Sequence, residues 1–287
     1  MARGNLFASL ARDRRLKEDR EFITALARGL SVIESFDRDH SKLTLSEVAA
    51  RTNLSPATAR RCLWTLEKLG YVGSEGREYM LLPKVLSLGA TFLEAGRFEE
   101  LIQPVLRDIV TEAGDSASLG VMEGDDVLYL ANFSGKRYVR LTAGAGSRFP
   151  AYAVSIGRVL LAALNEAELE AYLDRARLEQ LTPSTITDKA RLRGLIEEVR
   201  QSGYVVVKDE LETGLAAVAV PIRLRSGKVV AGLNCSGFIR GNEDQDLVAA
   251  RLDVLRRGAA RINEVLRQVP SLSASLESTV ATVPASD

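Results

Sequence analysis

Apolar residues recur at helical spacing in two short segments near the N-terminus, over residues 45–52 and 56–69. The positions that set this spacing are Leu45, Val48, Ala49, Ala59, Cys62, Leu63, Leu66 and Leu69. Between the segments, Asn53 tolerates a left-handed backbone, which suits a tight turn. Ser55 is a favourable N-cap, and Pro56 follows at the first helical position, where its missing N–H costs nothing. The pattern predicts two helices joined by a short turn.

A third helical stripe precedes this pair, and a hairpin pattern follows it. The apolar residues of the preceding stripe are Phe22, Ile23, Leu26, Leu30, Ile33 and Phe36. Either Thr44 or Ser46 can cap the first helix of the pair. Residues 74–77 have turn chemistry and separate two short apolar runs. Helix, helix-turn-helix and hairpin together predict a winged helix-turn-helix domain over residues 22–82.

The outward face of the second helix of the pair is polar and basic. The candidate DNA-binding residues on this helix, its cap and the hairpin tip are Ser55, Ala57, Thr58, Arg60, Arg61, Thr65 and Arg77. Hydroxyl and guanidinium groups donate hydrogen bonds that base edges and phosphates accept. An ordinary helical hairpin with a solvated basic face would carry the same residues. The capped turn and the following hairpin favour a helix that enters the major groove of DNA.

The pattern changes after the hairpin. Residues 83–96 keep helical spacing and predict a linker helix, and we expect a second domain over residues 97–268. Its expected strands are 118–122, 127–133, 138–142, 204–207, 215–224 and 229–236, and its expected helices include 98–113, 155–164, 242–268 and two that are capped by Asn165 and Asp188. Because a short turn at 225–228 joins the last two strands, the sheet should be antiparallel and the fold class α+β. We also expect a flexible N-terminal arm over residues 1–21 and, from its Ser, Ala and Thr content, a disordered tail over residues 269–287.

Composition and charge limit the classes of function. The chain has 287 residues, of which 46% are hydrophobic and 26% are charged, as in a soluble protein with two domains. The formal net charge is zero, but residues 51–68 contain four basic residues and one acidic residue, a modest surplus that suits contact with a few phosphates. Two cysteines and one histidine give neither a disulfide framework nor metal-ligand spacing, so we expect no metal and no cofactor. The sequence lacks a long apolar run and a signal-peptide core, so we expect a cytoplasmic protein without membrane contact.

The second domain has the features of a binding domain. It contains no histidine, no metal-ligand cluster and no glycine-rich phosphate loop, which favours binding without catalysis. At the start of an apolar helix, within residues 146–162, free N–H groups favour a carboxylate, and two arginines place positive charge nearby. The candidate effector residues of this stretch are Arg148, Tyr152, Ser155 and Ile156. Alternatively, Arg148 and Arg158 pair with surface carboxylates, and Tyr152 fills the core.

A late strand offers two further candidates. Asn234 and Ser236 alternate with Leu233 and Cys235, so the polar pair and the apolar pair face opposite sides of the sheet. If the apolar side is the core, the polar pair can face water or can orient a ligand in a pocket. The pattern leaves both readings open.

Three segments resemble the IclR family of bacterial transcriptional regulators, and the likeness extends over roughly residues 20–268. They are the helix-turn-helix run at 45–72, GSRFPAYAVSIGRVLLA at 146–162, and GYVVVKDELETGLAAVAVPI at 203–222 followed by VVAGLNCSG at 229–237. The second and third segments are most similar to the branch that governs aromatic-acid breakdown through the β-ketoadipate pathway. The resemblance implies an α+β protein with an N-terminal winged helix-turn-helix domain, a linker helix and a C-terminal GAF/profilin-like antiparallel-sheet effector domain.

The resemblance also implies where an effector binds. The implied positions are the backbone N–H groups of Ser155 and Ile156 and the side chains of Val207, Ala217, Asn234 and Ser236. Relatives that bind glyoxylate or pyruvate carry an aspartate and a cysteine in place of Val207 and Ala217, so the resemblance implies a larger, less polar pocket for an aromatic acid or a ring-cleavage product. Glu210 and Glu212 are interpreted as structural, as partners for the two arginines. Some relatives hold a metal in this domain, and the lack of histidine argues against one here.

We therefore expect a ligand-responsive transcriptional regulator of aromatic-acid catabolism genes and no enzyme activity. The expected partners are double-stranded DNA with a near-palindromic operator, a small carboxylate or aromatic-acid effector, and further copies of the chain in a dimer or a dimer of dimers. The effector would act through its different affinities for two arrangements of the dimer. Three alternatives remain: a regulator of another catabolic operon, a DNA-binding protein whose second domain only oligomerises, and an enzyme whose product reports to the DNA-binding end.

Overall fold

The chain divides into two compact units, residues 1–91 and 92–287. The computed structural model describes residues 21–37, 39–135, 144–238 and 244–281. The predicted N-terminal arm, apart from residue 21, and the predicted strand at 138–142 lie outside these residues.

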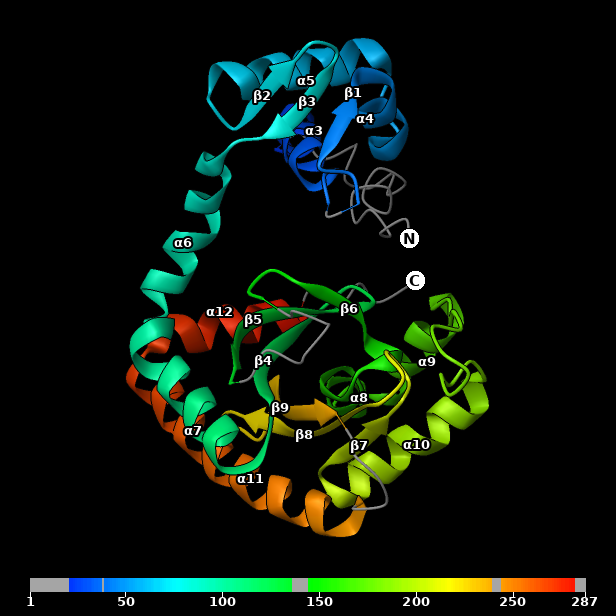
Figure 1. Ribbon diagram of the computed structural model, residues 1–287, viewed down its shortest axis with the longest axis vertical. Helices are drawn as coiled ribbons and strands as arrows, with labels where there is room; N and C mark the ends of the chain where they lie inside the picture. The colour runs from blue at the N-terminus through cyan, green and yellow to red at the C-terminus, as the bar shows by residue number, and fades with distance from the viewer. Residues whose placement is uncertain (1–20, 38, 136–143, 239–243, 282–287) are drawn as a thin grey trace. The chain divides into compact units, whose positions relative to one another are not determined.

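The N-terminal unit is a winged helix-turn-helix, as predicted (Figure 1). Its elements are α3 (Thr24–Glu34), β1 (Lys42–Thr44), α4 (Leu45–Thr52), α5 (Pro56–Lys68), β2 (Val72–Glu75) and β3 (Glu78–Leu81), with the strands antiparallel in the order β1-β3-β2. Thr44 forms a capping box with Glu47 at the start of α4. Asn53 takes the left-handed conformation at the turn, with φ 53°, and Ser55 caps α5 ahead of Pro56. The sequence does not predict β1, because three residues are too few to show an alternating pattern.

A buried carboxylate ties the end of α3 to α4. Asp37 hydrogen-bonds the backbone N–H and the ring of His40 at 2.9 Å, and it accepts from Arg51 Nη2 at 2.6 Å. Arg51 Nε also donates to the carbonyl of Ser35 at 2.8 Å. Burial alone would raise the pKa of Asp37, but the hydrogen bonds and the charge of Arg51 outweigh it and lower that pKa to about 2. The carboxylate therefore stays ionised far below neutral pH.

A helix leads from the first unit into the second, at the place of the predicted linker helix. It is α6 (Leu86–Ala95), which begins after a 3-10 turn at Pro83–Val85. A π-helical turn at Phe98–Ile102 then leads into α7 (Gln103–Ala113). Phe92 and Leu93, on the last turns of α6, pack against the apolar core of the C-terminal unit.

The C-terminal unit is built on a six-stranded antiparallel sheet, in agreement with the predicted α+β class. Its strands are β4 (Ser116–Glu123), β5 (Asp126–Ser134), β6 (Arg148–Pro150), β7 (Val205–Lys208), β8 (Leu215–Arg223) and β9 (Val229–Phe238), in the order β6-β5-β4-β9-β8-β7. The short strand β6 is not predicted from the sequence, for the same reason as β1.

Helices cover both faces of this sheet (Figure 1). One face carries α7, α11 (Asp244–Gln268) and α12 (Pro270–Ala281), and the other carries α8 (Ser155–Ala162), α9 (Glu166–Arg175) and α10 (Lys189–Ser202). Leu119 and Leu233 join the apolar core on the α7 and α11 side. Their chain neighbours Ser118 and Asn234 point to the opposite side, toward α8, because successive side chains on a strand alternate. Among the described helices, none has the length and apolar character needed to cross a bilayer.

The prediction of a disordered tail over 269–287 is wrong for residues 270–281. These residues form α12, whose Leu272 and Leu276 are buried in the core beside the sheet. Glu277 of the same helix pairs with Lys228 at 3.5 Å. The prediction was wrong because it rested on the average composition of the segment, which is rich in serine and alanine. Two leucines four residues apart are enough to give one side of the helix an apolar contact. Residues 282–287 lie outside the described chain.

Candidate functional site

The second helix of the helix-turn-helix presents its basic side to solvent. Its inner side, formed by Ala59, Leu63 and Leu66, is buried in the core of the N-terminal unit. The predicted contact residues Ala57, Arg60, Arg61 and Thr65 are all exposed, and Thr58 is half-buried. None of the ion pairs among the described residues involves either arginine of this helix. Both guanidinium groups are therefore available to phosphates and base edges.

The cap and the hairpin frame this surface. Ser55 Oγ accepts a hydrogen bond from the N–H of Thr58 at 3.3 Å, so the cap fixes the first turn of α5. Arg77 is exposed in the two-residue turn between β2 and β3, where Gly76 has φ 63°. Trp64 was not predicted from the sequence as part of this surface; it is 60% exposed on α5, and Lys68 Nζ lies 5.6 Å from its ring centroid. In the sequence, the signal that could have identified it is a large aromatic residue outside the apolar stripe of the predicted helix.

The N-terminus of α8 is an uncapped helix end inside the C-terminal unit. Ser155, the first residue of α8, is 1% exposed, and no described side chain caps the helix or places a carboxylate in its first turn. The backbone N–H groups of Ser155 and Ile156 therefore have the geometry for an anion. Gly157 allows this arrangement, because a Cβ atom there would lie 2.1 Å from the carbonyl oxygen of Ala151.

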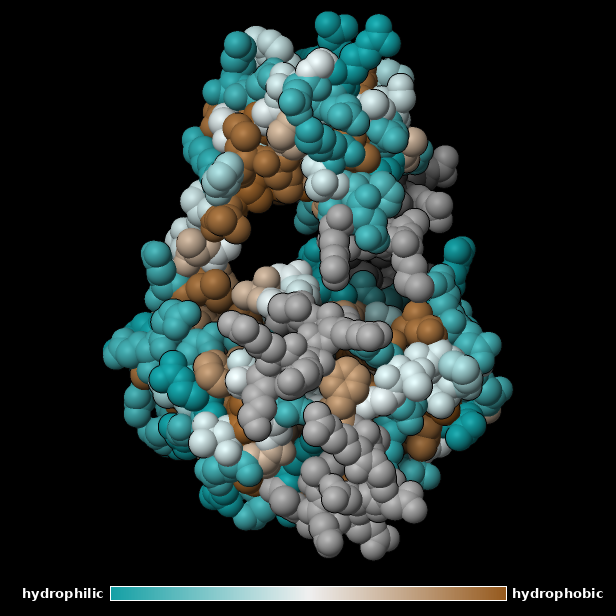
Figure 2. Space-filling model, viewed as in Figure 1, coloured by the Kyte–Doolittle hydropathy of each residue, from teal (hydrophilic) through white to brown (hydrophobic). Residues whose placement is uncertain are grey.

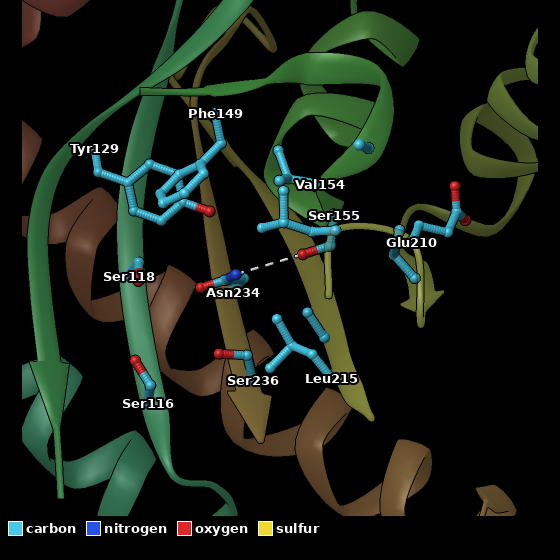
Figure 3. A pocket seen from close by; sticks show the side chains of 14 residues that line it. Ser116, Ser118, Tyr129, Phe149, Val154, Ser155, Glu210, Leu215, Asn234 and Ser236 are labelled. Carbon is cyan, nitrogen blue, oxygen red and sulfur yellow. Dashed lines mark hydrogen bonds between the residues drawn. The ribbon is translucent and has the colours of Figure 1, made fainter. Parts of the chain in front are cut away.

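A pocket lies between this helix end and the sheet (Figure 3). The space enclosed by its walls amounts to about 560 Å³, part of which is open to solvent. It is lined by Ser116, Ser118, Tyr129, Phe149, Ala153, Val154, Ser155, Val207, Glu210, Leu211, Leu215, Ala217, Asn234 and Ser236. The walls thus combine an apolar body with a few hydroxyl and amide groups, as expected for a ligand with polar ends.

Asn234 is the most informative polar group of the pocket. Its Nδ2 atom donates to Ser155 Oγ at 3.4 Å, and its Oδ1 atom is buried without a partner among the described residues. A buried acceptor without a donor is costly, so this atom marks a place where a ligand would donate a hydrogen bond. Tyr129 stacks edge-on against Phe149, with ring centroids 5.1 Å apart, and its hydroxyl points into the pocket (Figure 3). Burial raises the pKa of Tyr129, so this hydroxyl remains a neutral donor.

The structure brings five of the predicted effector residues to the pocket. They are Ser155, Val207, Ala217, Asn234 and Ser236. The polar pair of the late strand therefore faces a pocket and not open water. The side chain of Ile156 is fully buried in the core, so only its backbone N–H can serve the predicted role.

Arg148 and Tyr152 do not line the pocket, contrary to the prediction. Arg148, on the edge strand β6, pairs with Glu123 at the end of β4. The Tyr152 hydroxyl donates to the carbonyl of Glu179 at 2.9 Å, and its ring is buried in the apolar core. A charged or aromatic side chain near a helix end in sequence can point away from it, and here the local partners determine where both side chains go.

A buried ion pair forms part of the pocket wall. Arg158, one turn into α8, donates to Glu210 Oε2 at 2.5 Å and to the carbonyl of Tyr152 at 3.1 Å. Glu210 Oε2 also accepts from the N–H of Ile186 at 3.2 Å, and its backbone carbonyl accepts from Thr185. The prediction that this glutamate is a structural partner of an arginine is confirmed. Among the lining residues that the structure describes, Glu210 is the charged one, so the pair leaves this part of the pocket wall without a net charge.

The pocket residues on β4 and β5 were not predicted from the sequence. Ser116 and Ser118 alternate with Ala117 and Leu119, which is the same signal that singled out the late strand. Antiparallel pairing with β9 then places Ser118 opposite Asn234. Burial raises the pKa of the Cys235 thiol to about 11, so this thiol stays protonated and unreactive at neutral pH. The described residues contain no cluster suited to a metal ion.

Both units match known protein families. Residues 25–76 match the IclR helix-turn-helix domain, and residues 92–264 match the bacterial transcriptional regulator IclR C-terminal domain. The chain is 44% identical, over 77% of its length and 76% of the relative, to the Pca regulon regulatory protein of Pseudomonas putida. A putative transcriptional regulator from Rhodococcus sp. RHA1 is 40% identical, with a TM-score of 0.73 over 86% of this chain and 100% of that one. An IclR homologue from Microbacterium hydrocarbonoxydans, solved in complex with 4-hydroxybenzoate, is 28% identical, with a TM-score of 0.70 over 85% of this chain and 99% of that one.

Proposed function

The chain belongs to the IclR family of bacterial transcriptional regulators, and on that premise we propose that it controls aromatic-acid catabolism genes in response to a small carboxylate bound beside α8. The DNA-binding unit is a winged helix-turn-helix with an exposed basic helix. In the proposal, α5 enters the major groove, where Arg60 and Arg61 contact bases and phosphates, and Arg77 contacts the backbone from the wing. The regulator acts in the cytoplasm, where its DNA is.

The proposed form on DNA is a homodimer, or a dimer of dimers, on a near-palindromic operator. The highly exposed large apolar side chains of the described residues all fall between residues 23 and 88: Ile23, Leu26, Leu30, Trp64, Leu69, Leu86 and Leu88. Figure 2 shows apolar side chains on the surface of the N-terminal unit. Such side chains favour burial against a second copy, and two copies provide the two recognition helices that a palindrome requires. Light scattering of the purified protein measures the state, and a monomer at micromolar concentration would contradict this part of the proposal.

One observation carries the effector assignment: the uncapped N-terminus of α8, whose first residue Ser155 is 1% exposed, lies at the wall of the pocket. The helix end suits a carboxylate. The walls formed by Phe149, Val154 and Leu215 suit an apolar or aromatic body. Two of the similar proteins support the aromatic branch, because one regulates the Pca regulon and the other was solved with 4-hydroxybenzoate. Effector binding would change the DNA affinity of the oligomer to the extent that it favours one arrangement over another.

Calorimetry of the full chain against aromatic acids and their ring-cleavage products tests this proposal. Ser155→Asp places a protein carboxylate at the helix end that the ligand would use, and it should weaken binding at least tenfold. Asn165→Asp is the matched control, because it adds the same charge at the N-cap of α9, away from the pocket lining. If the Ser155→Asp and Asn165→Asp variants bind the acid with equal affinity, or if the unmodified protein binds none of the acids, the proposed site is wrong.

A further inference from the structure

The β4 wall of the pocket carries a set of polar groups that the proposed function does not use. Ser116 and Ser118 line the pocket and are 4% and 2% exposed (Figure 3). Asn132, on the neighbouring strand β5, donates from Nδ2 to both hydroxyl oxygens, at 2.9 Å each. Asn132 Nδ2 also lies 3.3 Å from the carbonyl oxygen of Ala117, which can only accept, and this contact fixes the orientation of the amide. The single hydrogen of Ser134 can go to Asn132 Oδ1 at 3.1 Å or to Ser116 Oγ at 3.3 Å.

This arrangement leaves the hydroxyl hydrogens of both serines available to a ligand. A serine hydroxyl has one hydrogen to donate and two lone pairs that accept. The oxygens of Ser116 and Ser118 already accept from Asn132. Within the described residues the Ser118 hydroxyl has no protein acceptor, and the acceptor within reach of the Ser116 hydroxyl is Ser134 Oγ at 3.3 Å, on an exposed residue. Because both side chains are buried against the pocket, a ligand oxygen that accepts these hydrogens would satisfy donors that are otherwise unused.

The two donors lie at different distances from the helix end. The register of β4 and β9 places Ser118 opposite Asn234, which contacts Ser155, and places Ser116 opposite Ser236. Residues two apart on a strand are separated by about 7 Å. The row with Ser116 and Ser236 is therefore displaced from the carboxylate position by a length comparable with the distance between opposite substituents of an aromatic ring.

We propose that Ser116 and Ser236, with Ser118 on the side nearer the helix end and Asn132 positioning both β4 hydroxyls, form a second subsite that binds an oxygen acceptor at the far end of the effector. The inference rests on the proposed function, since it assumes that the first carboxylate lies at α8. The ligand class is then an acid that carries a second oxygen group, a hydroxyl or a carboxylate, beyond an apolar body. Glu210 is already neutralised by Arg158, so this second group is selected by hydrogen-bond donors and not by an unpaired cation.

Calorimetry with two matched ligand pairs tests the subsite on the full chain. Benzoate is compared with 4-hydroxybenzoate, and hexanoate is compared with adipate. The member with the second oxygen group should bind at least about tenfold more tightly in one pair, and that pair identifies the group as hydroxyl or carboxylate. In the double variant Ser116→Ala and Ser118→Ala, the ratio within the pair should fall to about one, and the affinity for the simple acid should stay unchanged within about threefold.

Asn132→Leu keeps both serines and removes the group that orients them. The same ratio should fall in this variant, whereas a general loss of stability would weaken both members of a pair alike. Ser226→Ala, at an exposed turn outside the pocket lining, is the control and should leave the ratio unchanged. Equal binding within both pairs, or a ratio that survives in the serine and asparagine variants, would overturn the subsite and leave the proposed function standing. No binding of any of the four acids, nor of the aromatic acids and ring-cleavage products, would remove the effector site and the subsite with it.

Discussion

Replacing Glu210 by leucine removes the carboxylate that neutralises Arg158 inside the C-terminal unit. The pair is buried, with 2% of the Arg158 side chain and 8% of the Glu210 side chain exposed. The carboxylate accepts from Arg158 and from the N–H of Ile186. Because the change leaves a buried charge without compensation, the free energy of unfolding should fall by about 3–5 kcal/mol. Arg158→Met should cost a similar amount, and the double variant should cost less than the sum by at least about 2 kcal/mol.

Urea unfolding of the full chain measures these costs. With a denaturant slope of about 1–3 kcal/mol per molar, a loss of about 4 kcal/mol shifts the midpoint of the C-terminal unit by at least about 1 M. Circular dichroism follows both units. Trp64, the single tryptophan of the chain, lies in the N-terminal unit, so its fluorescence gives an internal control whose transition should not move.

Two results would refute this reasoning. If each single variant lowers the free energy of unfolding by less than about 1 kcal/mol, the charge that remains must find compensation from other groups. Strict additivity in the double variant would show that the two side chains are not energetically coupled. In either case the loop after β7 would be held mainly by Thr182 and Thr185, whose hydroxyls donate to its backbone carbonyls.

Three further predictions concern other parts of the chain. Arg60→Ala should weaken binding to the operator by about 1–3 kcal/mol and relax sequence preference at one position, measured by fluorescence anisotropy with operator and scrambled duplexes; unchanged affinity would exclude α5 as the recognition helix. Asp37→Asn should lower the stability of the N-terminal unit by about 2 kcal/mol at neutral pH, because the pKa of Asp37 falls from 3.8 to about 2 on folding. This contribution is complete above the unfolded pKa and is lost as the pH falls through about 2, so unfolding curves of variant and parent should converge at the acid end, and a constant difference would contradict the assignment. Leu272→Ala with Leu276→Ala should destabilise the C-terminal unit by about 2–5 kcal/mol per leucine, whereas Ser275→Ala, on an exposed position of α12, should have little effect; thermal unfolding that is unchanged by the leucine variants would show that α12 is not packed on the core.

The features that the sequence predicts well are those determined within a few residues. Asn53, Ser55 and Pro56 specify a turn and a helix start by their own backbone preferences, so the helix-turn-helix could be predicted without knowledge of its neighbours. The short turn at 225–228 likewise implied the antiparallel sheet. The apolar residues at 155–164 predicted the helix whose start forms one side of the pocket, and the resemblance to a known family implied that the N–H groups of Ser155 and Ile156 bind the effector.

The rest of the site depends on contacts between distant parts of the chain. Ser118 becomes a pocket residue only because β4 pairs with β9, and that pairing brings it opposite Asn234, more than one hundred positions away. The positions of Arg148 and Tyr152 depend on partners in other elements, which no local pattern encodes. Helix α12 was missed because its buried leucines, Leu272 and Leu276, are few among the serine and alanine residues of the segment.

The described part of the pocket wall carries no net charge, so the proposed effector binding and DNA binding should respond differently to ionic strength. Mobile ions screen exposed charges strongly and buried hydrogen bonds weakly. A metabolite held by the buried end of α8 and by hydroxyl groups should therefore be sensed equally well in dilute and concentrated electrolyte. Contact between an exposed cationic helix and phosphates releases condensed counterions and weakens as salt rises. Osmotic changes in the cell would thus alter the fraction of the regulator that is bound to its operator, while its affinity for the metabolite would stay the same.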